Sequence, residues 1–309
     1  PFCSSRLGMV EPMTVFCPLL TSLGISGETQ ARMIHGPTSP IVFFLLALVL
    51  APFLLGVINR TKAFFGGRCG QPLLQAYYDI HRLFKKGAVY SRTVGWVFRL
   101  SPVVGVGVSM GVLLFMPFGS VAPVLSFAGD MVALFYLMGL ARFLMISAAL
   151  DTASAFEGMG ASREALFSAL AEPALFIGLA ALVRARGSFS LAGIFSPDVA
   201  GKEYSFAVDI LIGTAFFLLL LSENSRIPVD DPQTHLELTM IHEVMVLDHS
   251  GPDFGLILYA SSLKMWFFCS LTVHAFAPGL SPLGFFLAVV LTAVGVGIAL
   301  WTNQLAISE

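Results

Sequence analysis

The sequence predicts an all-α protein, a polytopic bundle of helices that crosses a lipid bilayer several times. Hydrophobic residues make up 56% of the 309 residues and charged residues only 12%, whereas a soluble domain of this length carries about a quarter charged residues. Glycine occurs 29 times, and it is commoner in membrane helices than in soluble ones. The four scattered cysteines form no CxxC pair, so neither a disulfide framework nor an iron–sulfur site is indicated.

Seven segments are apolar enough to cross a bilayer, which takes about 20 residues each. They are 40–58, 97–118, 124–149, 165–183, 206–222, 254–276 and 282–302. Residues 1–36 are interrupted by Pro and Glu and lack the basic region and cleavage site of a signal peptide. We therefore expect a poorly defined N-terminal segment over 1–36 and a single membrane domain over 37–309.

The distribution of Lys and Arg predicts the orientation. The loop 59–96 holds seven Lys and Arg residues, and short loops of this kind stay in the cytoplasm. By alternation, the links 150–164 and 223–253 also face the cytoplasm. The outer link 184–205 disagrees mildly, because it carries three basic residues.

The first cytoplasmic loop contains an amphipathic pattern. Leu73, Tyr77, Ile80 and Phe84 fall on one stripe, and this spacing predicts a helix over 71–86 that lies in the membrane interface. A membrane-surface anchor with no further role explains this spacing equally well, so a docking role stays open at this point.

The third cytoplasmic loop also has helix signals. Asp231 suits an N-cap, Pro232 suits the first helical turn, and Gly251-Pro252 is typical of a helix stop. These signals predict a helix over 232–250.

Three histidines recur at a spacing of seven residues in this segment, namely His235, His242 and His249. Seven residues rise about 10.5 Å along a helix, which is too far for neighbouring histidines to share one metal ion. "HEVMVLDH" also lacks the HExxH spacing of a zinc protease. We expect polar contacts at the protein surface and no metal site.

Ionisable residues interrupt the apolar spans. Arg142, Glu172 and Lys264 lie deepest, and an ionised group at the bilayer centre costs roughly 2.5–3.5 kcal/mol on insertion scales. We expect these three to face one another or a wet cavity, as along an ion path, and a purely structural buried pair is the alternative. Asp130 and Asp151 lie near span ends, where a side chain can reach the interface.

The link 223–253 gathers seven carboxylates against one base, Arg226. The carboxylates are Glu223, Asp230, Asp231, Glu237, Glu243, Asp248 and Asp253. Neighbouring like charges raise one another's pKa, and groups with pKa values near neutrality can pass protons. This pattern favours the cytoplasmic end of a proton path.

Two stretches, "SENSRIPVDDPQTHLELTMIHEVMVLDHSGPD" and "LDTASAFEGMGASREALFSALAEPAL", resemble one family. It is the membrane-anchor subunit of group 4 energy-converting nickel–iron hydrogenases, of the formate hydrogenlyase and hydrogenase-4 type. This family is homologous to the quinone-chamber subunit of respiratory complex I. The acidic loop matches at Glu223, Arg226, Pro228, Asp230, Asp231, Glu237, Glu243 and Asp248. The other loops match at Gly70, Pro72, Tyr78 and Asp79, and at Arg163, Glu164, Glu172 and Pro173.

The resemblance implies a multi-pass subunit of the bacterial inner membrane that binds no cofactor directly and is not an enzyme alone. Its expected partners are the nickel–iron large subunit, the iron–sulfur small subunit and antiporter-like membrane subunits, and its expected role is to link electron transfer to proton or sodium translocation. The family has eight spans, and Glu309 falls short of the final one. Glu157 stands where the family usually has Gly, so it is given no role.

Combining these inferences gives two sets of candidate residues. The ion pathway comprises Glu223, Asp230, Asp231, Glu237, Glu243, Glu172, Arg142 and Lys264. Partner docking is assigned to Pro72, Tyr78, Asp79, Arg82, Arg163, Arg226, Pro228, His242 and Asp248.

Three alternatives stay open. The nearest is a quinone-chamber subunit of a complex I-like NADH or ferredoxin:quinone oxidoreductase. A membrane prenyltransferase would need two Asp-rich loops around magnesium, and the other cytoplasmic loops do not supply the second. A bare channel or a structural anchor is the simplest alternative.

Overall fold

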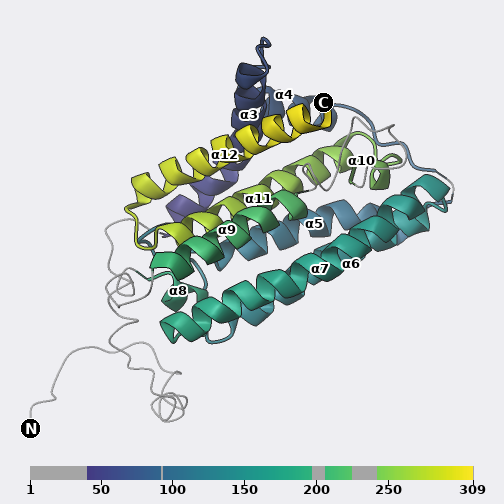
Figure 1. The fold of residues 1–309 in the computed structure, drawn as a ribbon. Helices are drawn as coiled ribbons and strands as arrows, with labels where there is room; N and C mark the ends of the chain where they lie inside the picture. The colour runs from purple at the N-terminus through teal and green to yellow at the C-terminus, as the bar shows by residue number, and fades with distance from the viewer. Residues whose placement is uncertain (1–39, 92, 197–205, 225–241, 309) are drawn as a thin grey trace, which may run out of the picture. The chain divides into compact units, whose positions relative to one another are not determined.

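The computed structural model describes residues 40–91, 93–196, 206–224 and 242–308, which belong to one compact unit, Ser39–Glu309. Helices make up most of these ranges, and no β-strand occurs within them (Figure 1). The all-α prediction is therefore confirmed. The segment 1–36 lies outside the described residues.

Six helices in these ranges are long and apolar enough to cross a membrane. They are α3 (Pro40–Phe65), α5 (Trp96–Leu114), α6 (Asp130–Asp151), α7 (Ala155–Arg186), α11 (Pro252–Phe276) and α12 (Pro282–Ser308). Each overlaps one predicted span. The remaining prediction, 206–222, coincides with α9 (Phe206–Glu223). Its 18 residues rise about 27 Å, slightly less than the roughly 30 Å of a hydrocarbon core.

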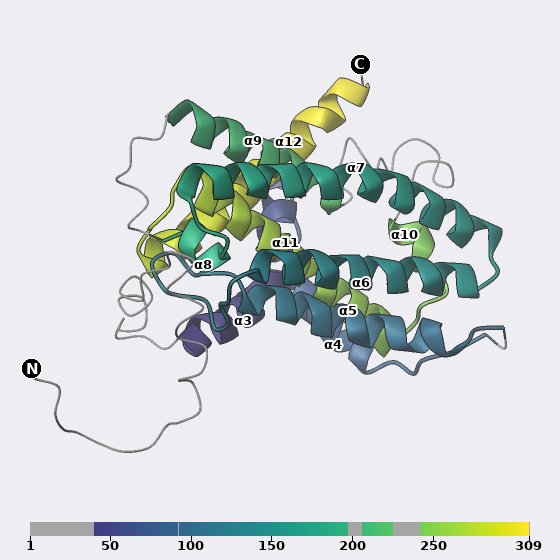
Figure 2. The same ribbon diagram turned by 90° about the horizontal axis from the view of Figure 1, so that it is seen from below.

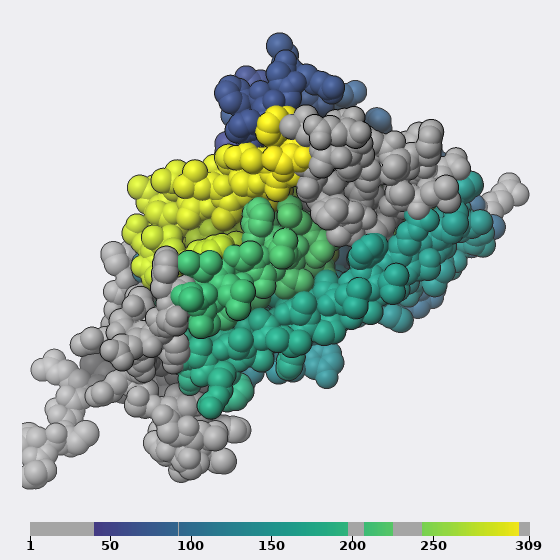
Figure 3. Space-filling model, in the orientation of Figure 1, coloured from purple at the N-terminus to yellow at the C-terminus, as the bar shows by residue number. Residues whose placement is uncertain are grey.

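Helix α11 is the centre of the bundle. It packs against α3, α4, α5, α9 and α12, and nearly every residue from Ser262 to Ala275 is buried. Helices α6 and α7 run side by side at one flank of α5 and α9 (Figures 1 and 2). In the space-filling view, α7, α9 and α12 share one face of the unit (Figure 3). A charged residue in the middle of α11, such as Lys264, therefore lies inside the bundle.

The amphipathic helix α4 (Gln75–Phe84) is shorter than the predicted 71–86. It packs against α3 and α11, and the Tyr77 hydroxyl donates to the carbonyl of Val49 in α3. A Cβ at Gly56 would collide with the carbonyl of Leu73, so the absence of a side chain there lets the chain before α4 lie directly on α3.

The predicted loop 150–164 is mostly helix, because α7 begins at Ala155. Ala, Glu and Met are strong helix formers, and the polar residues of this stretch lie on the first turns of α7, before its apolar part. The loop assignment was wrong because composition alone separated this polar portion from the span that it continues.

The predicted helix 232–250 is wrong at its C-terminal end. The short helix α10 (His242–Met245) is followed by a turn, and α11 begins at Pro252. Gly251 has a φ of 57° and precedes the first turn of α11. Gly-Pro was interpreted as a stop, but Pro is equally favoured at the first position of a helix. Residues 225–241 lie outside the described ranges.

Candidate functional site

Arg142 of α6 is the hub of a buried ionic network, with 9% of its side chain exposed. Its Nη2 donates to both carboxylate oxygens of Glu223, at 2.9 and 2.8 Å. Its Nη1 donates to Glu172 of α7, and its Nε lies 3.7 Å from Oε1 of Glu164. One guanidinium thus contacts three carboxylates, an arrangement that suits its fork of five N–H donors.

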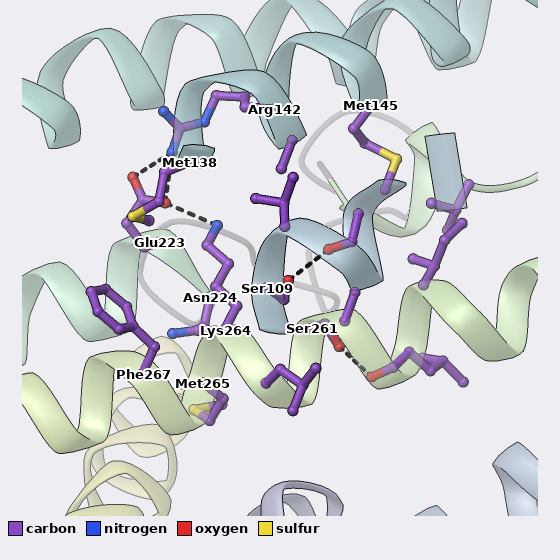
Figure 4. Close-up of a pocket in the computed structure, with 18 of the residues that line it drawn as sticks. Ser109, Met138, Arg142, Met145, Glu223, Asn224, Ser261, Lys264, Met265 and Phe267 are labelled. Carbon is purple, nitrogen blue, oxygen red and sulfur yellow. Dashed lines mark hydrogen bonds and ion pairs between the residues drawn. The ribbon is translucent and has the colours of Figure 1, made fainter. Parts of the chain in front are cut away.

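Lys264 of α11 completes the network from the opposite side. Its Nζ lies 2.9 Å from Oε2 of Glu223, whose side chain is only 4% exposed. Glu223 at the end of α9 is therefore held between two cations from two different helices (Figure 4). Together, these five residues connect α6, α7, α9 and α11.

The helix positions explain why these side chains meet. Glu164 and Glu172 are eight residues apart on α7, about 12 Å along the axis, and Arg142 on the neighbouring α6 reaches both. At the end of α9, the Leu220 carbonyl accepts both the backbone N–H of Asn224, at 3.3 Å, and the Asn224 side-chain amide, at 2.8 Å. The packing of α6 against α7 and of α7 against α9 thereby brings one base and three acids together.

A cavity of about 340 Å³ adjoins the network. Arg142, Glu164, Glu223, Glu243 and Lys264 contribute its charged lining. The rest is largely apolar and is drawn from α5, α6 and α11, as the side chains of Met138, Met145, Met265 and Phe267 in Figure 4 illustrate. The site can accept water or an amphiphilic molecule beside a group of fixed charges.

The structure brings together four residues of the predicted ion pathway: Arg142, Glu172, Glu223 and Lys264. Glu243 lines the adjoining cavity. Asp230, Asp231 and Glu237 lie outside the described residues. Glu164 was not assigned to the pathway because it fell in the predicted loop 150–164. Its spacing of eight residues from Glu172 was the signal that could have found it.

The predicted docking residues divide between two places. Pro72, Tyr78 and Arg82 are exposed on or just before α4, while Asp79 is half-buried and accepts from Gln75 Nε2 at 2.8 Å. Arg163 is half-buried on α7 and Asp248 is exposed after α10. Arg226, Pro228 and the side chain of His242 lie outside what the structure describes.

His249 is buried rather than exposed, so the prediction of a surface contact was wrong for this histidine. Its ring stacks on Phe98 with centroids 3.8 Å apart and planes inclined by 7°, and neither ring nitrogen has a hydrogen-bond partner. Burial lowers the pKa of His249 to about 4, although the nearby charges of Asp253 and Asp248 act in the opposite direction. His249 is therefore a neutral packing group at neutral pH.

Glu157 holds the same link from α7. Its Oε1 accepts the backbone N–H of Asp248 at 3.0 Å, and its Oε2 is buried without a partner. No role was assigned to Glu157 from the sequence. The structure gives it a positional one, since it attaches the segment after α10 to the start of α7.

Charged residues near the other helix ends have structural contacts. Asp130 is fully buried and accepts from the backbone N–H of Leu191 and the hydroxyl of Ser190, at 2.9 and 2.8 Å. It anchors the start of the short helix α8 (Leu191–Ile194) instead of reaching the interface, so that expectation was wrong. Asp151 accepts from the backbone N–H of Gly95.

Among the described side chains, no group of three or more His, Cys, Asp or Glu residues is placed to hold a metal ion.

The fold and the site define a class of protein: a multi-pass helical membrane protein with a buried network of acids and bases. Within this class, the family described as NADH dehydrogenase matches residues 38–306, and the chain belongs to that family. The resemblance predicted from the sequence is confirmed.

Curated relatives agree with this assignment. Formate hydrogenlyase subunit 4 of Escherichia coli (strain K12) is 32% identical over 278 residues, which cover 86% of this chain and 89% of the relative. Hydrogenase-4 component C of the same organism is 32% identical over 244 residues, covering 77% and 76%. The H-type subunit of NADH-quinone oxidoreductase from Rubrobacter xylanophilus (strain DSM 9941 / JCM 11954 / NBRC 16129 / PRD-1) is 26% identical over 254 residues, covering 79% and 75%.

A solved structure shares the fold. A chain of the membrane-bound sulfane sulfur reductase, an archaeal respiratory membrane complex, superposes with a TM-score of 0.66 at 20% identity, covering 84% of this chain and 85% of that chain. The protein is thus a membrane subunit of a complex I-like complex.

Proposed function

We propose that this chain is the integral membrane subunit of an energy-converting hydrogenase or formate hydrogenlyase-type complex of a bacterial inner membrane. It docks a nickel–iron subunit and an iron–sulfur subunit on its cytoplasmic side and links their electron transfer to proton or sodium movement. Support comes from the two relatives named as formate hydrogenlyase subunit 4 and hydrogenase-4 component C. The observation that carries the proposal is the contact of Arg142 with Glu164, Glu172 and Glu223.

Such a network is suited to moving a charge because its bases can exchange partners. Arg142 is shared among three carboxylates, and Glu223 is shared between Arg142 and Lys264. A small shift of either base would leave one carboxylate less neutralised, and a carboxylate that loses its cation binds a proton more readily. A change of charge in a docked redox subunit can therefore be answered by proton uptake or release at Glu223.

The cavity supplies the route between this network and the cytoplasmic link. Glu243, in the acidic link, and Lys264 both line it. We assign Asp230, Asp231 and Glu237 to the same mouth from the sequence. Docking would use three exposed residues of the basic loop: Pro72, just before α4, and Tyr78 and Arg82, on α4.

Glu223→Gln tests the path. The amide keeps the shape of the side chain but cannot carry the charge, so hydrogen turnover per assembled complex should fall by about tenfold or more, since a positioned proton-transfer group contributes roughly 10²–10⁴-fold. Assembly is measured separately as nickel and iron co-purified with the chain.

Asp130→Asn is the matched control, because Asp130 is a buried carboxylate that contacts α8 rather than the network. Its turnover per assembled complex should equal that of the wild type. Unchanged turnover and unchanged ion movement in Glu223→Gln would remove the path assignment. Purification of the wild-type chain from its own membranes without a nickel-bearing subunit would remove the hydrogenase assignment.

A quinone-chamber role is the second candidate, and the cavity favours it specifically. About 340 Å³ of largely apolar space beside Lys264 and Glu223 suits a molecule with an apolar body and a polar head. Quinone reduction by the purified complex, blocked by quinone-site inhibitors, would establish this alternative, and hydrogen evolution insensitive to those inhibitors would exclude it.

A further inference from the structure

Among the six described helices that are long and apolar enough to cross a membrane, α6 is the least buried. Only 17% of its most apolar window is buried, against 61% for α11. Val132, Tyr136, Leu140 and Phe143 follow one another at helical spacing along its outer face, and Tyr136 and Phe143 are 77% and 66% exposed. This face is open to whatever adjoins the subunit in the membrane.

A shallow groove of about 540 Å³ runs between this face and α7; the two helices lie side by side in Figures 1 and 2. We refer to it as the α6–α7 groove; its lining includes Val132, Tyr136, Gly139, Phe143 and Glu172. Apart from its own helix, no atom lies within 4 Å of the place where a Cβ on Gly139 would stand. Gly139 therefore leaves a notch in which another backbone can approach closely.

Glu172 gives the groove a charge. Its side chain is 43% exposed, whereas that of Arg142 is 9% exposed and that of Glu223 is 4% exposed. Within the described part of the chain, Arg142 is the partner of Glu172, through one carboxylate oxygen. Arg142 shares its charge with two further carboxylates, so it neutralises Glu172 only in part.

The depth of Glu172 makes this exposure costly. It lies seven residues inside the apolar stretch 165–183, about 10 Å from its nearer end. A Glu side chain is too short to reach the interface from there, and lipid acyl chains offer no hydrogen-bond donor. Ionisable groups at such depth pair with one another or with a wet cavity.

We propose that the α6–α7 groove seats a transmembrane helix of a neighbouring membrane subunit, and that a Lys or Arg of that helix pairs with Glu172. The inference rests on the proposed function only in that the chain assembles with further membrane subunits. The apolar stripe and the notch at Gly139 fit a helix, and the half-exposed carboxylate fits a cation.

A second copy of this chain fits the groove poorly. A symmetric dimer through this face would place the same patch on both sides and would bring two Glu172 carboxylates together, which is unfavourable without a cation between them. Lipid would leave the exposed carboxylate oxygen without a donor. These two occupants are the competing outcomes of the test.

The first experiment blocks the groove in the native complex. Gly139→Leu fills the notch, at a position where an added Cβ meets no neighbouring atom within 4 Å. Gly107→Leu, on α5, is the control because its Cβ position is equally open. Gly139→Leu should reduce the amount of membrane partner that co-purifies in mild detergent by about tenfold, the change that follows from losing 1.4 kcal/mol of binding free energy. Gly107→Leu should leave it unchanged. Equal retention, or equal loss, in the two variants would overturn the proposal.

The second experiment identifies the occupant. A photocrosslinking residue replaces Tyr136 in the full complex in its own membrane, and the crosslinked peptide is sequenced. A transmembrane segment of another subunit with a Lys or Arg supports the proposal. Crosslinks only to lipid, to a second copy of this chain, or to a segment without a basic residue refute it.

The two experiments separate this inference from the proposed function. The redox subunits are proposed to dock at the cytoplasmic loops, so nickel and iron should remain with Gly139→Leu when the membrane partner is lost. If wild-type complex contains no nickel, the hydrogenase assignment fails, and the Tyr136 crosslink still decides what occupies the groove.

Discussion

Protonation of His249 should release the link between α10 and α11. The ring is stacked on Phe98, both of its nitrogens lack partners, and burial lowers its pKa from 6.5 to about 4. When the link opens, the ring enters water and regains a pKa near 6.5. The open state therefore binds a proton between pH 6.5 and pH 4 while the closed state does not.

The sign and size of the effect follow from linkage. Because the open state binds more protons in this window, the free energy of opening decreases as the pH falls below 6.5. Each pKa unit corresponds to 1.36 kcal/mol, so opening should become about tenfold more frequent by pH 5.5. By pH 4 the free energy of opening should have decreased by about 3 kcal/mol. Above pH 6.5 the closed link keeps its full stability.

Hydrogen–deuterium exchange of the peptide covering 248–251 measures this opening, after correction for the pH dependence of intrinsic exchange. His249→Phe is the matched variant, since a phenyl ring can still stack on Phe98 and does not titrate. Its protection should stay constant from pH 7 to pH 5.5 while that of the wild type falls by about tenfold. The same decrease in both proteins would refute the assignment of this pH dependence to His249.

Three further predictions concern the packing around the site. Arg142→Lys should lower the free energy of unfolding by about 2 kcal/mol, because an ammonium cannot replace the fork that binds Glu223 through both oxygens. Thermal unfolding of the detergent-solubilised complex measures this loss. Arg184 is exposed, so Arg184→Lys should show no change. Gly251→Ala should lower the free energy of unfolding by about 2 kcal/mol or more, since φ is 57° and the new Cβ would stand 2.6 Å from the Gly87 carbonyl oxygen. Gly87→Ala, with open space around its Cβ, should leave the thermal midpoint unchanged in the same assay. Asp130→Ala should destabilise the subunit by roughly 2–3 kcal/mol, because it leaves the Leu191 N–H and the Ser190 hydroxyl without their acceptor. A thermal midpoint equal to that of the wild type would contradict this role of Asp130.

The spans could be predicted because an apolar run in a membrane protein has few other interpretations. Six predicted spans overlap helices that satisfy the length and hydropathy of a membrane crossing. The boundaries failed where polar residues continue a helix. Glu164 lies on the third turn of α7, yet its polar neighbours placed it in a loop, so the third acid of the Arg142 network was missed.

The charged core of the site was visible for the same reason that the spans were. Arg142, Glu172 and Lys264 stood out because each interrupts an apolar run, and burial without a partner would be too costly. The sequence could not show which acid meets which base. That depends on the packing of α6 against α7 and of α11 against α9, which a single sequence does not encode in its periodicity.

His249 shows the opposite case. Its spacing from His242 is compatible with one helix face, but the helix ends at Met245. The chain then turns, and His249 enters the space beside Phe98. A Gly-Pro pair can end one helix or begin the next, and only the contact of Gly251 with the backbone of Lys86 and Gly87 decides between them here.

Helix α11 contacts both the proposed docking helix α4 and, through Lys264, the ionic network. It begins at Pro252 beside the backbone of Lys86 and Gly87, packs against α4, and carries Lys264 twelve residues later, about 18 Å along the axis. Under the proposed function, a redox subunit that presses on α4 acts on the same rigid helix that positions Lys264 against Glu223. Their charged atoms are 2.9 Å apart, so a separation of a little more than about 1 Å would take them beyond the roughly 4 Å of an ion pair. Under the same proposal, a movement of α4 would reach the network directly, because α11, which packs against α4, also holds one of its two bases.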